Sequence, residues 1–245
     1  KQEIRFKDVT DDFSSLGIFG PNSRKFLTEL FGNYFLNKDF PFATGRFIIF
    51  LNVKIWFQRL SFVGELGWEL YIPIKDSKKI FNKIQTLEKK YKLCYSGMHA
   101  MDMLRLEKKF LHWGHDITSA NNPIESGLRF AVSLKKKYNF IGRSSIEKII
   151  AKPLKKRIEL FSLKKCIVPG KPLLMHDEPI FFKDKIVGYS TSSNYSFYYK
   201  KNIFLAYVKE DIDIKKLTIE VEGKKYSLHH EEKCLHDPTG QQLRN

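Results

Sequence analysis

The chain has 245 residues, of which 42% are hydrophobic and 29% are charged. This composition is typical of a globular protein with one large domain or two modest ones. The longest apolar run, around residues 47–53, is strand-sized and contains Asn52. A membrane helix needs roughly 20 apolar residues, so we expect no membrane span.

The formal net charge is +16, from 43 Lys and Arg against 27 Asp and Glu. Such a charge fits either a surface for nucleic acid or acidic lipid, or a lysine-rich proteome. The lysines lie in short scattered groups, and no helix-turn-helix, KH or RNP-like pattern accompanies them. We therefore favour the second interpretation and expect neither a nucleic-acid nor a membrane partner. A positive field still favours capture of an anionic ligand.

Three cysteines, Cys94, Cys166 and Cys234, are widely separated and include no CxxC pair. An odd number with this spacing argues against a disulfide framework or a zinc site. We expect free thiols in a reducing compartment, which is the cytoplasm or, in a eukaryote, the mitochondrial matrix.

Apolar–polar alternation predicts five strands in the first part of the chain. They span residues 3–9, 14–19, 46–50, 54–63 and 68–72. Gly20 and Pro21 break the chain after the second strand, and Asn22 or Ser23 can cap a helix that ends near residue 30. The Gly64–Gly67 segment predicts a tight turn that joins the last two strands into a hairpin.

Two longer helices are predicted next. Asp76 or Ser77 can cap a helix over residues 77–92, because Ile80, Ile84 and Leu87 recur at helical spacing. A second helix is predicted over residues 98–110.

The pattern changes after Pro153, where short strands alternate with turn signals such as Pro169-Gly170-Lys171. The expected strands span residues 157–163, 178–182, 185–190, 203–208, 217–221 and 224–228. This pattern predicts a small all-β barrel or sandwich. We therefore expect an α+β domain over residues 1–152 and a β-barrel domain over residues 153–245.

Catalytic and metal-binding motifs are absent from the sequence. There is no GxSxG, Walker or GxGxxG pattern and no HExxH pair. His112 and His115 are three residues apart, but Gly114 between them disfavours a helix, and the His229-His230 pair is typical of a solvated loop. We predict no catalytic residue and no metal in this chain, and a binding role is the better expectation.

Several motifs in register carry a resemblance to a known family. They are SFVGELGWELY at 61–71, MLRLEK at 103–108, WGHDI at 113–117, NPIESGL at 122–128, FIGR at 140–143, VGYSTS at 187–192 and DPTG at 237–240. Their order resembles the folate-binding C-terminal region of dimethylglycine and sarcosine dehydrogenases, which is homologous to the glycine cleavage T-protein, an aminomethyltransferase. The resemblance covers essentially the whole chain. It implies an aminomethyltransferase-like α+β fold that ends in a small β-barrel, with a pocket for tetrahydrofolate.

A reduced pterin presents a 2-amino group and an N3–H side by side, and one carboxylate can accept both. Glu65 and Glu69 are the candidates. Glu65 lies in the turn, where a charge is normally solvated, whereas Glu69 lies on a strand between apolar Trp68 and Leu70. Periodicity alone also allows Glu69 to face water on an edge strand. The family's pterin-binding glutamate matches Glu69, and the resemblance extends the site to Leu70 and Tyr71.

Three more residues match family positions at the folate. Phe62 stands where an aromatic residue, usually Tyr, contacts the ligand, and Phe130 matches a second aromatic that packs on it. Both are also compatible with ordinary core packing in a chain with 21 Phe. Arg157 matches an arginine suited to pterin carbonyl or glutamyl carboxylate groups, or it belongs to a solvated Lys155-Lys156-Arg157 cluster.

The sequence departs from the aminomethyltransferases at Met101, where they carry arginine and the dimethylglycine-type enzymes carry an apolar residue. The family's catalytic aspartate and the flavin module that binds FAD match nothing in this chain, so we expect the N-terminal part of the fold to be missing. The expected whole is a flavin-dependent enzyme whose missing module oxidises a small methylated amine, while this region captures the one-carbon unit as 5,10-methylenetetrahydrofolate. The alternatives are a folate-dependent aminomethyltransferase or demethylase without flavin, or a non-catalytic protein that binds folate or, through its +16 charge, nucleic acid.

Overall fold

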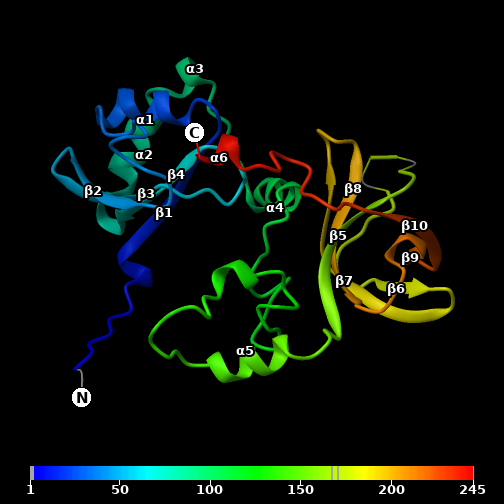
Figure 1. The fold of residues 1–245 in the computed structure, drawn as a ribbon. Helices are drawn as coiled ribbons and strands as arrows, with labels where there is room; N and C mark the ends of the chain where they lie inside the picture. The colour runs from blue at the N-terminus through cyan, green and yellow to red at the C-terminus, as the bar shows by residue number, and fades with distance from the viewer. Residues whose placement is uncertain (1–2, 167, 170, 245) are drawn as a thin grey trace. The chain divides into compact units, whose positions relative to one another are not determined.

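The computed structural model describes residues 3–166, 168–169 and 171–244, which form two compact units (Figure 1). The first unit contains Lys1–Gly97 together with Thr239–Asn245, and the second contains Met98–Pro238. No helix in the described part of the chain combines the length and apolar character needed to cross a membrane.

The first unit is built on a four-stranded antiparallel sheet with the order β1-β4-β3-β2. The strands are β1 (Phe13–Phe19), β2 (Gly45–Phe50), β3 (Val53–Gln58) and β4 (Gly67–Pro73). The helices of this unit are α1 (Ser23–Phe31), α2 (Ser77–Gln85), α3 (Glu88–Tyr91) and α6 (Gln241–Arg244), with 3-10 turns at Thr10–Asp12 and Ile74–Asp76.

One face of this sheet forms the core of the first unit. Trp68, Leu70 and Ile72 of β4 are fully buried and belong to one cluster with Phe26 of α1 and Ile80 of α2. Because side chains alternate along a strand, the residues between them point to the opposite face. That opposite face carries half-buried and exposed side chains.

A buried arginine ties the C-terminal residues to the first unit. Arg59 is 1% exposed and donates hydrogen bonds to the carbonyl oxygens of Phe40 (2.7 Å) and Arg244 (2.6 Å). Burial, with repulsion from Arg24, lowers the pKa of Arg59 to about 10. The cation also lies over the Trp68 ring, 5.5 Å from its centroid, so it is retained by both hydrogen bonds and an aromatic face.

The second unit contains a closed barrel with the strand order β10-β5-β8-β7-β6-β9. Its strands are β5 (Lys156–Leu163), β6 (Pro179–Phe182), β7 (Lys185–Ser196), β8 (Lys201–Lys209), β9 (Leu217–Val221) and β10 (Lys224–His230). Helices α4 (Met98–Glu107) and α5 (Arg143–Ile150) precede the barrel, with 3-10 turns at Arg129–Ala131 and Ile214–Lys216.

A buried ion pair links α4 to the barrel. Arg105 is 1% exposed and pairs with Asp116, whose side chain is fully buried. Arg105 also donates to Ser192 Oγ of β7 (2.7 Å), and Thr191 Oγ1 donates to Asp116 (2.5 Å). The backbone N–H of His112 donates to the same carboxylate at 2.8 Å. The pair is therefore satisfied from three segments of the chain, as a buried charge requires.

The predicted α+β architecture with a C-terminal β-barrel is confirmed, and the six strands expected after Pro153 are all present. The central residue of the predicted turn at 169–171 lies outside the described residues. The predicted domain boundary between residues 152 and 153 stays a prediction. Two further helices, α5 and α6, were not predicted.

Several local predictions were wrong. Residues 3–9 form no strand: Ile4 and Phe6 are 65% and 92% exposed, and no described strand pairs with them. The Asn22 side chain makes no capping hydrogen bond, and Ser23 Oγ instead donates to the Leu66 carbonyl (3.1 Å). The helix expected over 77–92 breaks after Gln85, and α3 then closes at Lys92 in the left-handed conformation.

Replacement of Asp116 by Ala should destabilise the second unit by about 3 kcal/mol, because it leaves the buried Arg105 cation with less compensation. Urea unfolding at pH 7 measures this change. Asp102→Ala is the matched control, since Asp102 also pairs with Arg105 but its side chain is 30% exposed. The control should lose less than about 1 kcal/mol. Equal losses would show that Asp116 has no special structural role.

Candidate functional site

The predicted site residues fall on both compact units. Phe62, Glu69, Leu70 and Tyr71 belong to the first unit, and Phe130 and Arg157 belong to the second.

Glu69 lies on the face of β4 opposite the core and is half-buried. The Tyr71 hydroxyl donates a hydrogen bond of 2.9 Å to its Oε2. Among the described residues, no Lys, Arg or His lies within ion-pair distance of this carboxylate, and its Oε1 accepts no hydrogen bond. Burial, with the hydrogen bond and the charge of Glu69, raises the pKa of Tyr71. Tyr71 therefore remains a donor and fixes the orientation of the carboxylate.

Glu69 occupies the middle of a row of residues that crosses the sheet. Gly17 of β1 and Gln58 of β3 pair directly with Glu69, and Gly45 of β2 pairs with Gln58. Directly paired residues project from the same face of a sheet. We call Gly17, Glu69, Gln58 and Gly45 the cross-strand row. It presents a carboxylate and an amide side by side between two positions without side chains.

The strand pairing corrects the predicted hairpin. The loop between β3 and β4 spans residues 59–66, so it is longer than the expected Gly64–Gly67 turn. As a result Gln58, and not Phe62, stands opposite Glu69. Phe62 lies in the loop and is half-buried. Glu65 is half-buried in the same loop and also interacts with other residues, so it is not the freely solvated turn residue expected.

Leu70 points away from Glu69. Its side chain is fully buried in the core of the first unit. The physical reason is the alternation of the strand, which sends neighbouring side chains to opposite faces. A side-chain contact from Leu70 to a ligand on the Glu69 face is therefore excluded, and the prediction for this residue is limited to its backbone.

Phe130 and Arg157 line one cavity of the second unit, with a volume of about 570 Å³. Phe130 is 85% exposed, so it is not a core phenylalanine. Apolar side chains from the 108–111, 124–128 and 154–158 segments line the same wall, and the cavity is within the size range of ligand pockets. These side chains are Leu111, Ile124, Leu128, Leu154 and Ile158.

Arg157 is largely buried and its charge is compensated. Its Nε donates to Glu159 (3.1 Å), and its Nη1 lies 2.5 Å from Glu210 Oε2. Glu159 also accepts from Lys109 (2.9 Å) and lies 3.1 Å from His230 Nε2. Burial by itself would raise the pKa of Glu159, but Lys109 and His230 outweigh it and hold this pKa below its ordinary value. Arg157 is thus a member of an ion-pair network, and the interpretation as a solvated cluster is wrong.

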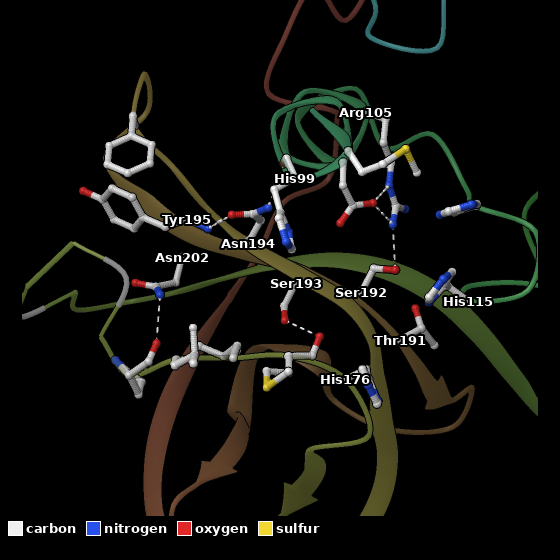
Figure 2. A pocket seen from close by; sticks show the side chains of 18 residues that line it. His99, Arg105, His115, His176, Thr191, Ser192, Ser193, Asn194, Tyr195 and Asn202 are labelled. Atoms are coloured by element: carbon white, nitrogen blue, oxygen red, sulfur yellow. Dashed lines mark hydrogen bonds and ion pairs between the residues drawn. The ribbon is translucent and has the colours of Figure 1, made fainter. Parts of the chain in front are cut away.

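A second cavity of the same unit, of about 610 Å³, contains none of the predicted site residues (Figure 2). Its labelled side chains come from α4 (His99 and Arg105), from β7 (Thr191 to Tyr195), from β8 (Asn202) and from the loops that carry His115 and His176. The rings of His112 and His115 lie 4.6 Å apart at its edge. The described residues contain no group of three or more His, Cys, Asp or Glu side chains that could hold a metal ion.

Comparison with known proteins defines the class. Residues 1–136 match the GCVT N-terminal domain, and residues 160–237 match the glycine cleavage T-protein C-terminal barrel domain. The chain belongs to this family. It is 33% identical to human mitochondrial dimethylglycine dehydrogenase over 98% of the chain and 30% identical to human mitochondrial sarcosine dehydrogenase over 86% of the chain. It spans only 28% and 22% of the length of these two proteins.

A solved structure shares the fold. The aminomethyltransferase T of the glycine cleavage system from Bartonella henselae superposes with a TM-score of 0.75 at 20% identity, covering 88% of this chain and 57% of that one. The resemblance stated from the motifs is therefore confirmed at the level of family and fold.

Glu159→Gln should make the stability of the protein less sensitive to acid. The folded-state pKa of Glu159 is lowered, so its ionised form stabilises the protein at pH values above about 4.5, and this contribution is lost as the pH falls toward the folded-state pKa. Urea unfolding between pH 7 and pH 3 measures the effect. Below about pH 4.5 the free energy of unfolding should fall more steeply for the unmodified chain than for the variant. Parallel curves would contradict the network.

Proposed function

We propose that this chain is the tetrahydrofolate-binding portion of a flavin-dependent enzyme similar to dimethylglycine and sarcosine dehydrogenases. In this proposal the folate captures a one-carbon unit and leaves as 5,10-methylenetetrahydrofolate. The chain's own residues bind and orient the folate. FAD and the site for the methylated amine belong to parts of such an enzyme that this chain does not contain.

The observation that carries the proposal is the carboxylate of Glu69. Partly removing a charge from water is costly unless it is paired, yet Glu69 is half-buried without a cation among the described residues. The chain carries 43 Lys and Arg, so a cation could have been supplied by many positions. An acceptor held in this way is suited to a ligand that brings its own donors.

A reduced pterin meets this requirement. Its 2-amino group and N3–H are adjacent donors, and a carboxylate accepts two parallel hydrogen bonds. Tyr71 holds Oε2 from the side and leaves Oε1 open. The pterin is also planar, and the rings of Trp56 and Phe19 stand on the same face of the sheet, where they can contact it.

Phe130 and Arg157, which belong to the second unit, stay proposed folate contacts on the family resemblance alone. The cavity that they line has an apolar wall suited to an aromatic group such as the aminobenzoyl ring. Since Arg157 is already paired with Glu159 and Glu210, its contribution to a glutamyl carboxylate should be modest. We therefore assign most of the binding energy to the pterin edge.

The two dehydrogenases that resemble this chain support the flavin-dependent version, and because both are mitochondrial proteins we extend the proposal to the mitochondrial matrix for a eukaryotic source. Met101, a half-buried apolar residue of α4, is consistent with this branch. An aminomethyltransferase or demethylase without flavin is the second candidate, favoured by the fold shared with the Bartonella henselae protein.

Glu69→Ala should abolish binding of 5-formyltetrahydrofolate, because it removes the acceptor for both pterin donors. A loss of about 100-fold or more in affinity is expected for a charge-assisted bidentate contact. Isothermal titration calorimetry of the 245-residue chain measures it.

Glu65→Ala is the matched control from the same loop-and-strand segment. It should cost less affinity, because Glu65 precedes β4 and does not belong to the cross-strand row. Equal losses for the two variants would reject Glu69 as the pterin ligand. Absence of binding by the unmodified chain would count against the proposed function itself.

A further inference from the structure

We infer that Gln58 determines specificity for the 4-oxo group of the pterin, acting beside Glu69 in the cross-strand row. This inference rests on the proposed function and assigns to the site a second recognition residue. Local sequence patterns do not point to Gln58, because the predicted turn places Phe62 across from Glu69.

The register between β3 and β4 supports this role of Gln58. Gln58 is the last residue of β3 and pairs directly with Glu69 of β4. Paired side chains project from the same face with their Cβ atoms about 5 Å apart. The amide and the carboxylate are therefore neighbours on the open face, at a spacing suited to adjacent groups on one edge of a bicyclic ring.

The second support is the free hydrogen-bonding capacity of Gln58. Its side chain is half-buried, yet its amide makes no hydrogen bond with any residue in the described part of the chain, Glu69 included. The neighbouring Tyr71 differs in this respect, because its hydroxyl donates a hydrogen bond to Glu69. A half-buried amide without a protein partner retains donors for a ligand.

The third support is complementarity. Along one pterin edge the 2-amino group donates, N3–H donates and the 4-oxo group accepts. Across the row, the Glu69 carboxylate accepts twice and the Gln58 amide donates. The order acceptor, acceptor, donor matches donor, donor, acceptor, so Glu69 and Gln58 together read three consecutive groups.

The shape of the row agrees with a flat ligand. A Cβ built on Gly45 would lie 2.3 Å from the Trp56 ring, and one built on Gly17 would lie 2.3 Å from the Phe19 ring. Each ring therefore occupies the space above a glycine at one end of the row. The two aromatic rings flank the Glu69–Gln58 pair, so a planar group bound between them meets the polar pair with its edge.

The test compares Gln58→Met with Gln58→Glu in the full 245-residue chain, titrated with 5-formyltetrahydrofolate. Met has a similar volume without the amide, so Gln58→Met should weaken binding about 10-fold. Gln58→Glu at pH 8 should weaken it at least about 100-fold, because an ionised carboxylate repels both the 4-oxo oxygen and Glu69.

Lowering the pH to about 5.5 should recover part of the affinity of Gln58→Glu relative to the unmodified chain, since the introduced carboxyl then protonates and can donate. A merely structural role for Gln58 predicts no such recovery. Gln85→Met, at an exposed glutamine of α2, is the matched control and should bind normally. Thermal unfolding verifies that every variant is folded.

The outcomes separate the two claims. Weaker binding by both Gln58 variants, with recovery in acid for Gln58→Glu, supports the inference. Normal binding by both variants, while Glu69→Ala fails to bind, overturns the role of Gln58 and leaves the proposed function intact. Failure of the unmodified chain to bind 5-formyltetrahydrofolate overturns both.

Discussion

The candidate site depends on the two-residue alternation of β4, one of the two inner strands of the four-stranded sheet. Trp68, Leu70 and Ile72 fill the core of the first unit, and this burial fixes the register, since a shift by one residue would place all three in solvent. The same constraint compels Glu69 and Tyr71 to face outward. The hydrophobic core therefore supplies the energy that holds a cation-free carboxylate in one position.

The second unit shows why widely separated motifs occur together. The MLRLEK, WGHDI and VGYSTS segments meet in one buried network, in which Arg105 and Asp116 pair and Thr191 and Ser192 bond to them. None of these four residues faces the cavity lined by Phe130 and Arg157. The motifs that identify the family thus include residues that join a helix to a barrel, and a motif by itself does not locate the ligand.

The sequence predicted the strands of both units well because their alternation and their bounding turns are local signals. It could also predict that Glu69 opposes Trp68 and Leu70, since that follows from strand geometry alone. It could not predict Gln58, because the partner of Glu69 depends on the length of the 59–66 loop, and the glycines at 64 and 67 suggested a shorter turn. The prediction of a strand over residues 3–9 was wrong for a related reason. Alternation is typical of a strand, but a strand is stable only beside a neighbouring strand.

The net charge of the chain contributes less to ligand recognition than its magnitude of +16 suggests. Three cations border the cavity lined by Phe130 and Arg157, namely Arg157, Lys109 and Lys108. Each is paired with a carboxylate, and this pairing largely offsets its attraction for a bound anion. Glu69 is the opposite case, a carboxylate without a cation in the described chain. In a protein of net charge +16 the unpaired group at the site is an anion. In the proposed folate site, selectivity then comes from directed hydrogen bonds along the ligand's edge, which discriminate by the position of donors and acceptors. The overall field can at most increase the rate at which an anionic ligand arrives.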